Sequence, residues 1–156
     1  MDNASPLARE ASIPNPCLDA FAPFIGSWTT VAHHSMMPGV TLNGRTVFEW
    51  YEGGAYLRVL SDVEEAGIPS AVSLIGSADD DDTFTMLYFD ERCVSRRFHV
   101  SVADHVLRWR RTAPGFSQRY ALTLAADRMT AHGVSEMSKD DKTWERDMDV
   151  GYTRAS

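Results

Sequence analysis

Cysteine is scarce in this chain, which has two among 156 residues. Cys17 precedes the first expected strand and Cys93 falls in an expected turn, so their positions fit neither a disulfide framework nor a metal site. Free thiols are typical of a reducing compartment. We therefore expect a cytoplasmic protein without structural disulfides.

Positive charge is also in short supply. Lysine and arginine together number 15 against 22 aspartates and glutamates, which gives a formal net charge of −7. Proteins bind nucleic acids and anionic membranes through clustered Lys and Arg that create a positive field. We therefore expect neither a nucleic acid nor a membrane as partner.

Long apolar runs and the common chemical motifs are missing too. Residues 1–6 lack the basic start and apolar centre of a signal peptide, and no apolar run approaches the ~20 residues that span a bilayer. The sequence has no Gly-x-Ser-x-Gly motif, no glycine-rich phosphate loop and no spacing typical of zinc ligands. We expect no metal and no cofactor.

The strongest positive signal is the stretch 24–34, in which Gly26 and Trp28 open an alternating run. Gly26 allows a tight turn out of a short helical segment, and Trp28 is large enough to fill the closed end of a barrel. A Trp at a strand start is rarely left in water, so its face should point inward. Strand parity groups four side chains on that face: Trp28, Thr30, Ala32 and His34.

After this stretch the apolar residues recur with a period of two, interrupted by turn residues at regular intervals. The pattern predicts an all-β protein, an antiparallel up-and-down β-barrel of about ten strands. We expect the strands near 27–34, 44–52, 55–64, 69–77, 83–90, 94–102, 105–111, 116–125, 129–137 and 143–153. The acidic run Asp79–Asp82 is interpreted as a solvated hairpin tip rather than a cation site.

The region before the first strand divides into two parts. Residues 1–16 contain three prolines among small and polar residues, which indicates a flexible N-terminal arm. Leu18, Phe21 and Phe24 follow at helical spacing, enough for a short helix that caps one end of the barrel. We expect residues 17–156 to form a single barrel domain.

Several segments together resemble a known family. Gly26-Ser27-Trp28, with Arg154 after the last strand, resembles the signature of the lipocalin (calycin) superfamily. The segments 48–54, 87–94, 113–120 and 133–141, in that order, are similar to a bacterial family of lipocalin-like proteins catalogued as a domain of unknown function. The resemblance covers about residues 18–154 and implies an intracellular barrel that holds a small apolar molecule. Arg92-Cys93-Val94 and Asp140-Asp141 depart from the family's Arg-Gly-Val and Asp-Gly, and both departures fall in turns.

A more distant resemblance is to the nitrobindin-like barrels, which also open with Gly-x-Trp. Proteins of that branch ligate haem iron through a His near the end of the last strand. Residues 142–154 contain no His in this chain. The resemblance therefore does not extend to haem, and we expect none to bind.

Candidate binding residues come from parity within the expected strands. Burial could shift the pKa of a lumen carboxylate or imidazole, and Glu136 should either pair with an inward Arg such as Arg58 or Arg146 or keep its proton. The face of His99 is ambiguous. The candidate ligand-binding set is His34, Trp50, Arg58, Tyr88, His99, Gln118, Tyr120, Glu136 and Arg146.

Three functions are compatible with such a barrel. We favour a binding protein for a small apolar or amphipathic molecule, because aromatic walls with few polar groups are typical of small-molecule pockets. A cofactor-free isomerase, cyclase or lyase that uses lumen Glu, His or Arg groups is the alternative. The third is a dimerisation module, in which barrel walls pack against each other as a homodimer.

Overall fold

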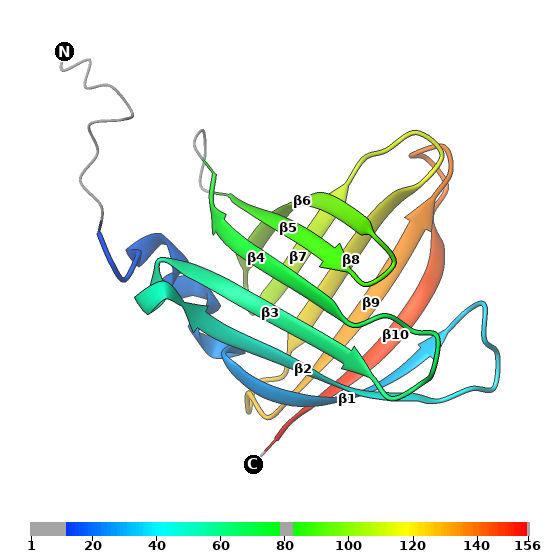
Figure 1. Cartoon of the computed structure of the whole chain (residues 1–156), viewed down its shortest axis with the longest axis horizontal. Coiled ribbons are helices and arrows are strands. Elements are labelled where there is room, and N and C mark those ends of the chain that lie inside the picture. The colour runs from blue at the N-terminus through cyan, green and yellow to red at the C-terminus, as the bar shows by residue number, and fades with distance from the viewer. Residues whose placement is uncertain (1–11, 79–82, 156) are drawn as a thin grey trace.

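The computed structural model describes residues 12–78 and 83–155, which form a closed antiparallel barrel (Figure 1). The barrel predicted from the period of two is confirmed, and the ten strands lie within two residues of the expected bounds. Each strand pairs with its sequence neighbours, and β1 pairs with β10 to close the barrel. The strands are β1 (Gly26–His34), β2 (Leu42–Tyr51), β3 (Tyr56–Val63), β4 (Ala71–Ser77), β5 (Phe84–Asp90), β6 (Val94–Ala103), β7 (Val106–Arg111), β8 (Ser117–Leu124), β9 (Thr130–Ser138) and β10 (Glu145–Arg154).

A 3₁₀ helix, η2 (Pro16–Phe24), lies across one end of the barrel, as the sequence predicted (Figure 1). Asn15 begins it by accepting a hydrogen bond from the Cys17 backbone N–H, and Pro16 stands in the first turn, where a missing N–H costs nothing. The apolar face of the helix is fully buried and fills this end of the barrel. A second short 3₁₀ helix, η3 (Glu52–Gly54), joins β2 to β3.

Arg154 locks the closed end. Its guanidinium donates to the backbone carbonyls of Ile25 at 2.7 Å, Pro23 at 2.9 Å and Arg128 at 3.1 Å. The same group lies 4.2 Å from the centre of the Trp28 ring, and Trp28 is 1% exposed. The predicted stacking of Arg154 on a buried Trp28 is confirmed, and it joins the last strand to the capping helix.

The inward-facing side chains change from fully buried to partly exposed along the barrel axis. Leu57, Ile75 and Leu107 in the closed half are fully buried. Towards the other end, the inward positions Val59, Ser135 and several more are partly exposed. The apolar side chains of Met37, Val40 and Ile68, from the loops after β1 and β3, pack against the core at this end. Solvent thus reaches the barrel interior from the end opposite η2, which we call the open end.

A β-bulge interrupts β10. Arg146 is opposite Glu136 of β9, but Met148 is opposite Ser135, so the register shifts by one residue around Asp147. A one-residue shift exchanges the faces of a strand. Met148, Val150 and Tyr152 therefore face the interior while Arg146, before the bulge, faces out.

The structure describes two of the turns singled out in the sequence and part of the N-terminal region. Cys93 and Asp141, both in turns, have positive φ angles of 64° and 63°, a backbone region that glycine adopts most readily. Residues 1–11 and the run Asp79–Asp82 lie outside the described residues. Asn15 belongs to the segment expected as an arm, and it bonds to the Gly54 carbonyl and the Ser77 hydroxyl. No helix within residues 12–78 and 83–155 is long and apolar enough to cross a bilayer.

Candidate functional site

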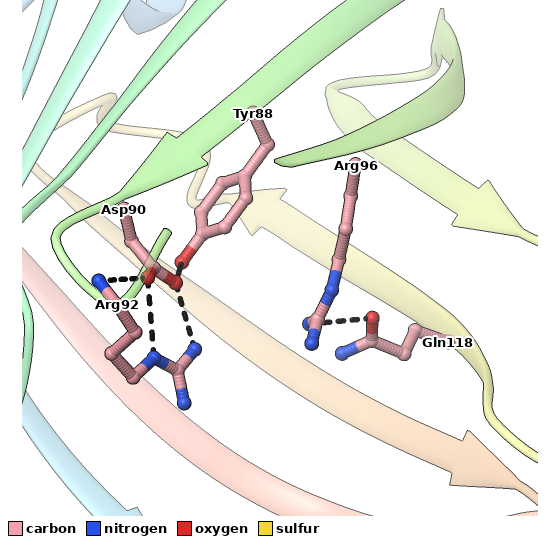
Figure 2. A network of polar contacts seen from close by, with 5 residues as sticks. All are labelled: Tyr88, Asp90, Arg92, Arg96 and Gln118. Carbon is pink, nitrogen blue, oxygen red and sulfur yellow. Dashed lines mark hydrogen bonds and ion pairs between the residues drawn. The ribbon is translucent and has the colours of Figure 1, made fainter. Parts of the chain in front are cut away.

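A charged cluster lies where β5 ends at the open end (Figure 2). Arg92 donates to both carboxylate oxygens of Asp90, at 3.2 Å from Nε and 2.7 Å from Nη2, and its backbone N–H adds a third bond at 2.9 Å. The Tyr88 hydroxyl donates to the same carboxylate at 2.8 Å. These bonds occupy Asp90, whose side chain has no exposed surface. The carboxylate is structural, and it fixes the β5–β6 turn.

The contacts of this cluster shift its pKa values in directions that follow from charge. Hydrogen bonds from Arg92 hold the pKa of Asp90 well below its usual range, and the same pairing raises the pKa of Arg92. Burial, with the hydrogen bond to Asp90, raises the pKa of Tyr88 to about 12. Tyr88 therefore stays a neutral donor at physiological pH.

Beside this cluster, Arg96 of β6 points into the open half of the barrel. Its Nη1 donates to the side-chain amide oxygen, Oε1, of Gln118 on β8 at 2.9 Å, and its guanidinium lies 5.4 Å from the centre of the Phe116 ring. Burial and the nearby positive charge of Arg111 lower the pKa of Arg96. Figure 2 shows the guanidinium turned towards Gln118 and away from Asp90.

A third polar group lies at the same end on β1 and β10. The Met36 backbone N–H donates to His34 Nδ1 at 3.1 Å, so the ring proton of a neutral His34 is on Nε2. That nitrogen lies 3.3 Å from Asp147 Oδ1, at the bulge. The open end therefore carries His34, Tyr88 and Gln118 from the predicted set.

Three predicted lumen residues are on the outer wall, and their expected inward direction is wrong. Arg58 pairs with Glu49 at 2.6 Å, because Leu57 and Val59 take the inward positions of β3. Arg146 faces out because of the bulge, and lies 3.3 Å from Asp149.

Glu136 is the third, and the expected lumen partners Arg58 and Arg146 do not contact it. It pairs with Arg119 at 2.9 Å across β8 and β9, on the outer wall. The guanidinium of Arg119 also lies 4.1 Å from the Trp144 ring centre. Of the two alternatives for Glu136, ion pairing is the one observed, although with a different arginine and outside the barrel.

Trp50 lies away from the open end, whereas Tyr120 faces the barrel interior midway along β8, opposite Trp109 and Ser135. Trp50 is 41% exposed and stands at the end of β2 near η3. Tyr120 is buried, stacks on Trp109 with ring centres 4.3 Å apart, and shares a 2.6 Å hydrogen bond with the Tyr152 hydroxyl. Burial raises the pKa of Tyr120 well above its usual value.

A groove of about 550 Å³ runs over the outer wall of β6 to β9. His99, whose face the sequence left open, points outward into it, together with Glu136. Three arginines stand around it on the same wall: Arg108, Arg110 and Arg119. The groove is a surface feature in which exposed side chains surround a floor that includes Ala121 and Val134.

Sequence reasoning missed four charged residues of the open end: Asp90, Arg92, Arg96 and Asp147. One signal was present for Arg96, because it shares a strand face with Phe98 and Val100, and a single Arg on an apolar face is unusual. No comparable signal marks Asp147, because its side chain reaches His34 only through the bulge in β10. Within the described residues, no three His, Cys, Asp or Glu side chains gather as a metal site.

The outer wall of β4 and β5 is apolar. Val72, Leu87 and Phe89 are 40%, 42% and 49% exposed, and Val72 is directly opposite Phe89 in the sheet. An apolar surface of this kind is the feature that self-association needs. The homodimer considered from the sequence stays a prediction.

Comparison with known proteins supports the fold. No protein-family model matches the sequence, and no curated protein matches it either. The crystal structure of Rv2717c from M. tuberculosis has the same fold, with a TM-score of 0.67 over 90% of this chain and 98% of that chain, at 13% sequence identity. This chain is therefore similar to that protein in architecture, a closed antiparallel barrel.

Proposed function

We propose that this protein binds a small apolar or amphipathic molecule inside the open half of its barrel. The observation that carries the proposal is the change in burial along the axis. Leu57, Ile75 and Leu107 fill the closed half, whereas Val59 and Ser135 face the interior and remain partly exposed. A barrel of this size can enclose one small ligand where its interior is not filled by side chains.

The lining of the open half suits such a ligand. Tyr88, Trp109 and Met148 supply apolar and aromatic surface, and Arg96 and Gln118 supply converging polar groups. Apolar walls with a few fixed polar groups are how small-molecule sites obtain both affinity and orientation.

Binding without turnover fits the arrangement better than catalysis. Glu136, the carboxylate considered as an acid or base, lies on the outer wall. At the open end Asp90 is bonded to Arg92 and Asp147 pairs with His34. An intracellular location belongs to the same proposal, and it is supported by two exposed free thiols, Cys17 and Cys93.

A fluorescent probe tests the location of the site. N-phenyl-1-naphthylamine, which is neutral and brightens in apolar surroundings, should bind the wild-type protein. Ser135 on β9 and Ser61 on β3 both take inward positions. Ser135→Trp and Ser61→Trp therefore place an indole inside the open half, and each should abolish the signal. Ser101→Trp is the matched control, because Ser101 faces the outer groove.

Thermal melts accompany the binding curves to show that each variant is folded. Folded inward variants that still bind the probe would contradict the proposal. Loss of the signal in Ser101→Trp alone would move the site to the outer groove.

A further inference from the structure

We propose that the ligand is an amphipathic acid, whose carboxylate is bound by Arg96 and Gln118 while its apolar body lies against the aromatic wall of the open half. This inference rests on the proposed function, and it adds the chemical class of the ligand. The proposal is based on a positive charge inside the barrel, that of Arg96, which has no counter-ion among the described residues.

Arg96 is a partly buried cation without a counter-ion. Among the residues that the structure describes, no carboxylate oxygen lies within 4.0 Å of its guanidinium. Its partners are the uncharged carbonyl oxygen of Gln118 and the face of Phe116. A charge removed from water without an opposite charge is costly, and a bound anion would relieve that cost.

The carboxylates of Asp90 and Asp147, both at the open end, are already bonded to other side chains. Asp90 accepts bonds from Arg92 and Tyr88, and Asp147 pairs with His34. Arg111 adds a second positive charge close enough to lower the pKa of Arg96. The inner side of β6 to β8 therefore has an excess of positive charge in a protein whose formal net charge is −7.

The geometry suits a carboxylate. Gln118 accepts from Arg96 through its carbonyl oxygen, so its NH₂ group keeps two N–H donors for another partner. The guanidinium also has more donors than the one bond uses, in a planar fork that matches a carboxylate. Figure 2 shows the guanidinium of Arg96 and the side-chain amide of Gln118 side by side. Tyr88 and Trp109, on the neighbouring strands, provide apolar surface for the body of the acid.

Displacement of N-phenyl-1-naphthylamine by decanoate and by 1-decanol tests the head group. The two probes share an alkyl chain and differ in charge. Decanoate should displace the dye from wild-type protein at least about tenfold more effectively, the order expected from one charge-assisted hydrogen bond.

Two substitutions at the site should remove this preference. Arg96→Met deletes the charge at nearly constant length. Gln118→Glu keeps the guanidinium but gives it a built-in counter-ion, and should raise thermal stability while it removes the preference for decanoate. Arg97→Met is the control, because Arg97 is the next residue of β6 and faces out.

The possible failures are distinguishable. Equal displacement by decanoate and 1-decanol in wild-type protein would overturn the acid and leave the proposed lumen site standing. If Arg97→Met and Arg96→Met lose the preference for decanoate equally, the preference comes from the overall charge of the protein. That result would also overturn the proposed binding of an acid at Arg96. A wild-type protein that does not bind the dye, or whose signal survives both inward Trp variants, would overturn the proposed function itself.

Discussion

Tyr120 and Tyr152 show how closely the buried side chains of the barrel are packed. Their hydroxyls lie 2.6 Å apart in a buried site, and the Tyr120 ring covers Gly133 so tightly that a Cβ at Gly133 would collide with its hydroxyl. A buried hydroxyl that loses its partner costs more than a pair removed together. The two tyrosines therefore act as a unit.

We predict that either Tyr120→Phe or Tyr152→Phe lowers the free energy of unfolding by about 1–3 kcal/mol, because one hydroxyl remains buried without its bond. The double variant should lose less than the sum of the two. Urea unfolding of all four proteins measures the coupling, with the exposed Tyr56→Phe as the control. Additive losses would show that the hydrogen bond contributes nothing.

At the scale of elements, β10 illustrates which features can be predicted from the sequence and which cannot: its position and Arg154 were predicted correctly, and the direction of Arg146 was not. All ten strands follow from a period of two and from turn residues, because both are local properties of the chain. Arg154 over Trp28 was also predictable, since parity and end position fix both side chains. Parity fails for Arg146 because a bulge between Arg146 and Met148 leaves no local signal.

The polar residues of the open end depend on contacts between strands far apart in sequence. Arg96 contacts Gln118, two strands along the barrel, and Asp90 is satisfied by a turn. Strand periodicity can place such residues on a face, but it cannot tell which charges neutralise each other. The candidate site was therefore predicted in part, through His34, Tyr88 and Gln118.

The clamp at the closed end is an element-scale prediction. Arg154→Lys should lower the free energy of unfolding by about 1–3 kcal/mol, because an ammonium cannot reproduce the planar set of bonds to three carbonyls. Urea unfolding measures the loss. Arg108→Lys on the exposed outer wall should change it by less than about 0.5 kcal/mol. Equal stability of the two variants would show that the clamp is not specific.

For the whole molecule, the three tyrosines with raised pKa values predict that the folded barrel loses stability at alkaline pH. The pKa values of Tyr88 and Tyr152 are each raised to about 12, and burial raises the pKa of Tyr120 well above its usual value. In the unfolded chain the tyrosine hydroxyls lose their protons at about pH 10. The contribution to stability is therefore complete below about pH 10 and is lost as the pH rises through the folded values.

Ultraviolet absorbance of phenolate and far-ultraviolet circular dichroism, recorded together from neutral to alkaline pH, check this loss of stability. We expect these three tyrosines to ionise together with the loss of β-structure. Tyr88→Phe/Tyr120→Phe/Tyr152→Phe should weaken the alkaline loss of stability, provided that it folds. Full ionisation of all five tyrosines while the barrel is intact would contradict the expectation.

The pairing of β1 with β10 also affects the order in which the strands can pair during synthesis. Trp28 is opposite Arg154 and His34 is opposite Met148, so the seam joins the two most distant parts of the barrel in sequence. During synthesis β1 leaves the ribosome early and has β2 beside it, but its other edge stays unpaired until β10 emerges. Closing so long a loop is entropically unfavourable and comes late in folding. The edge of β1 that faces β10 is therefore the strand edge that stays unpaired longest while the chain is synthesised.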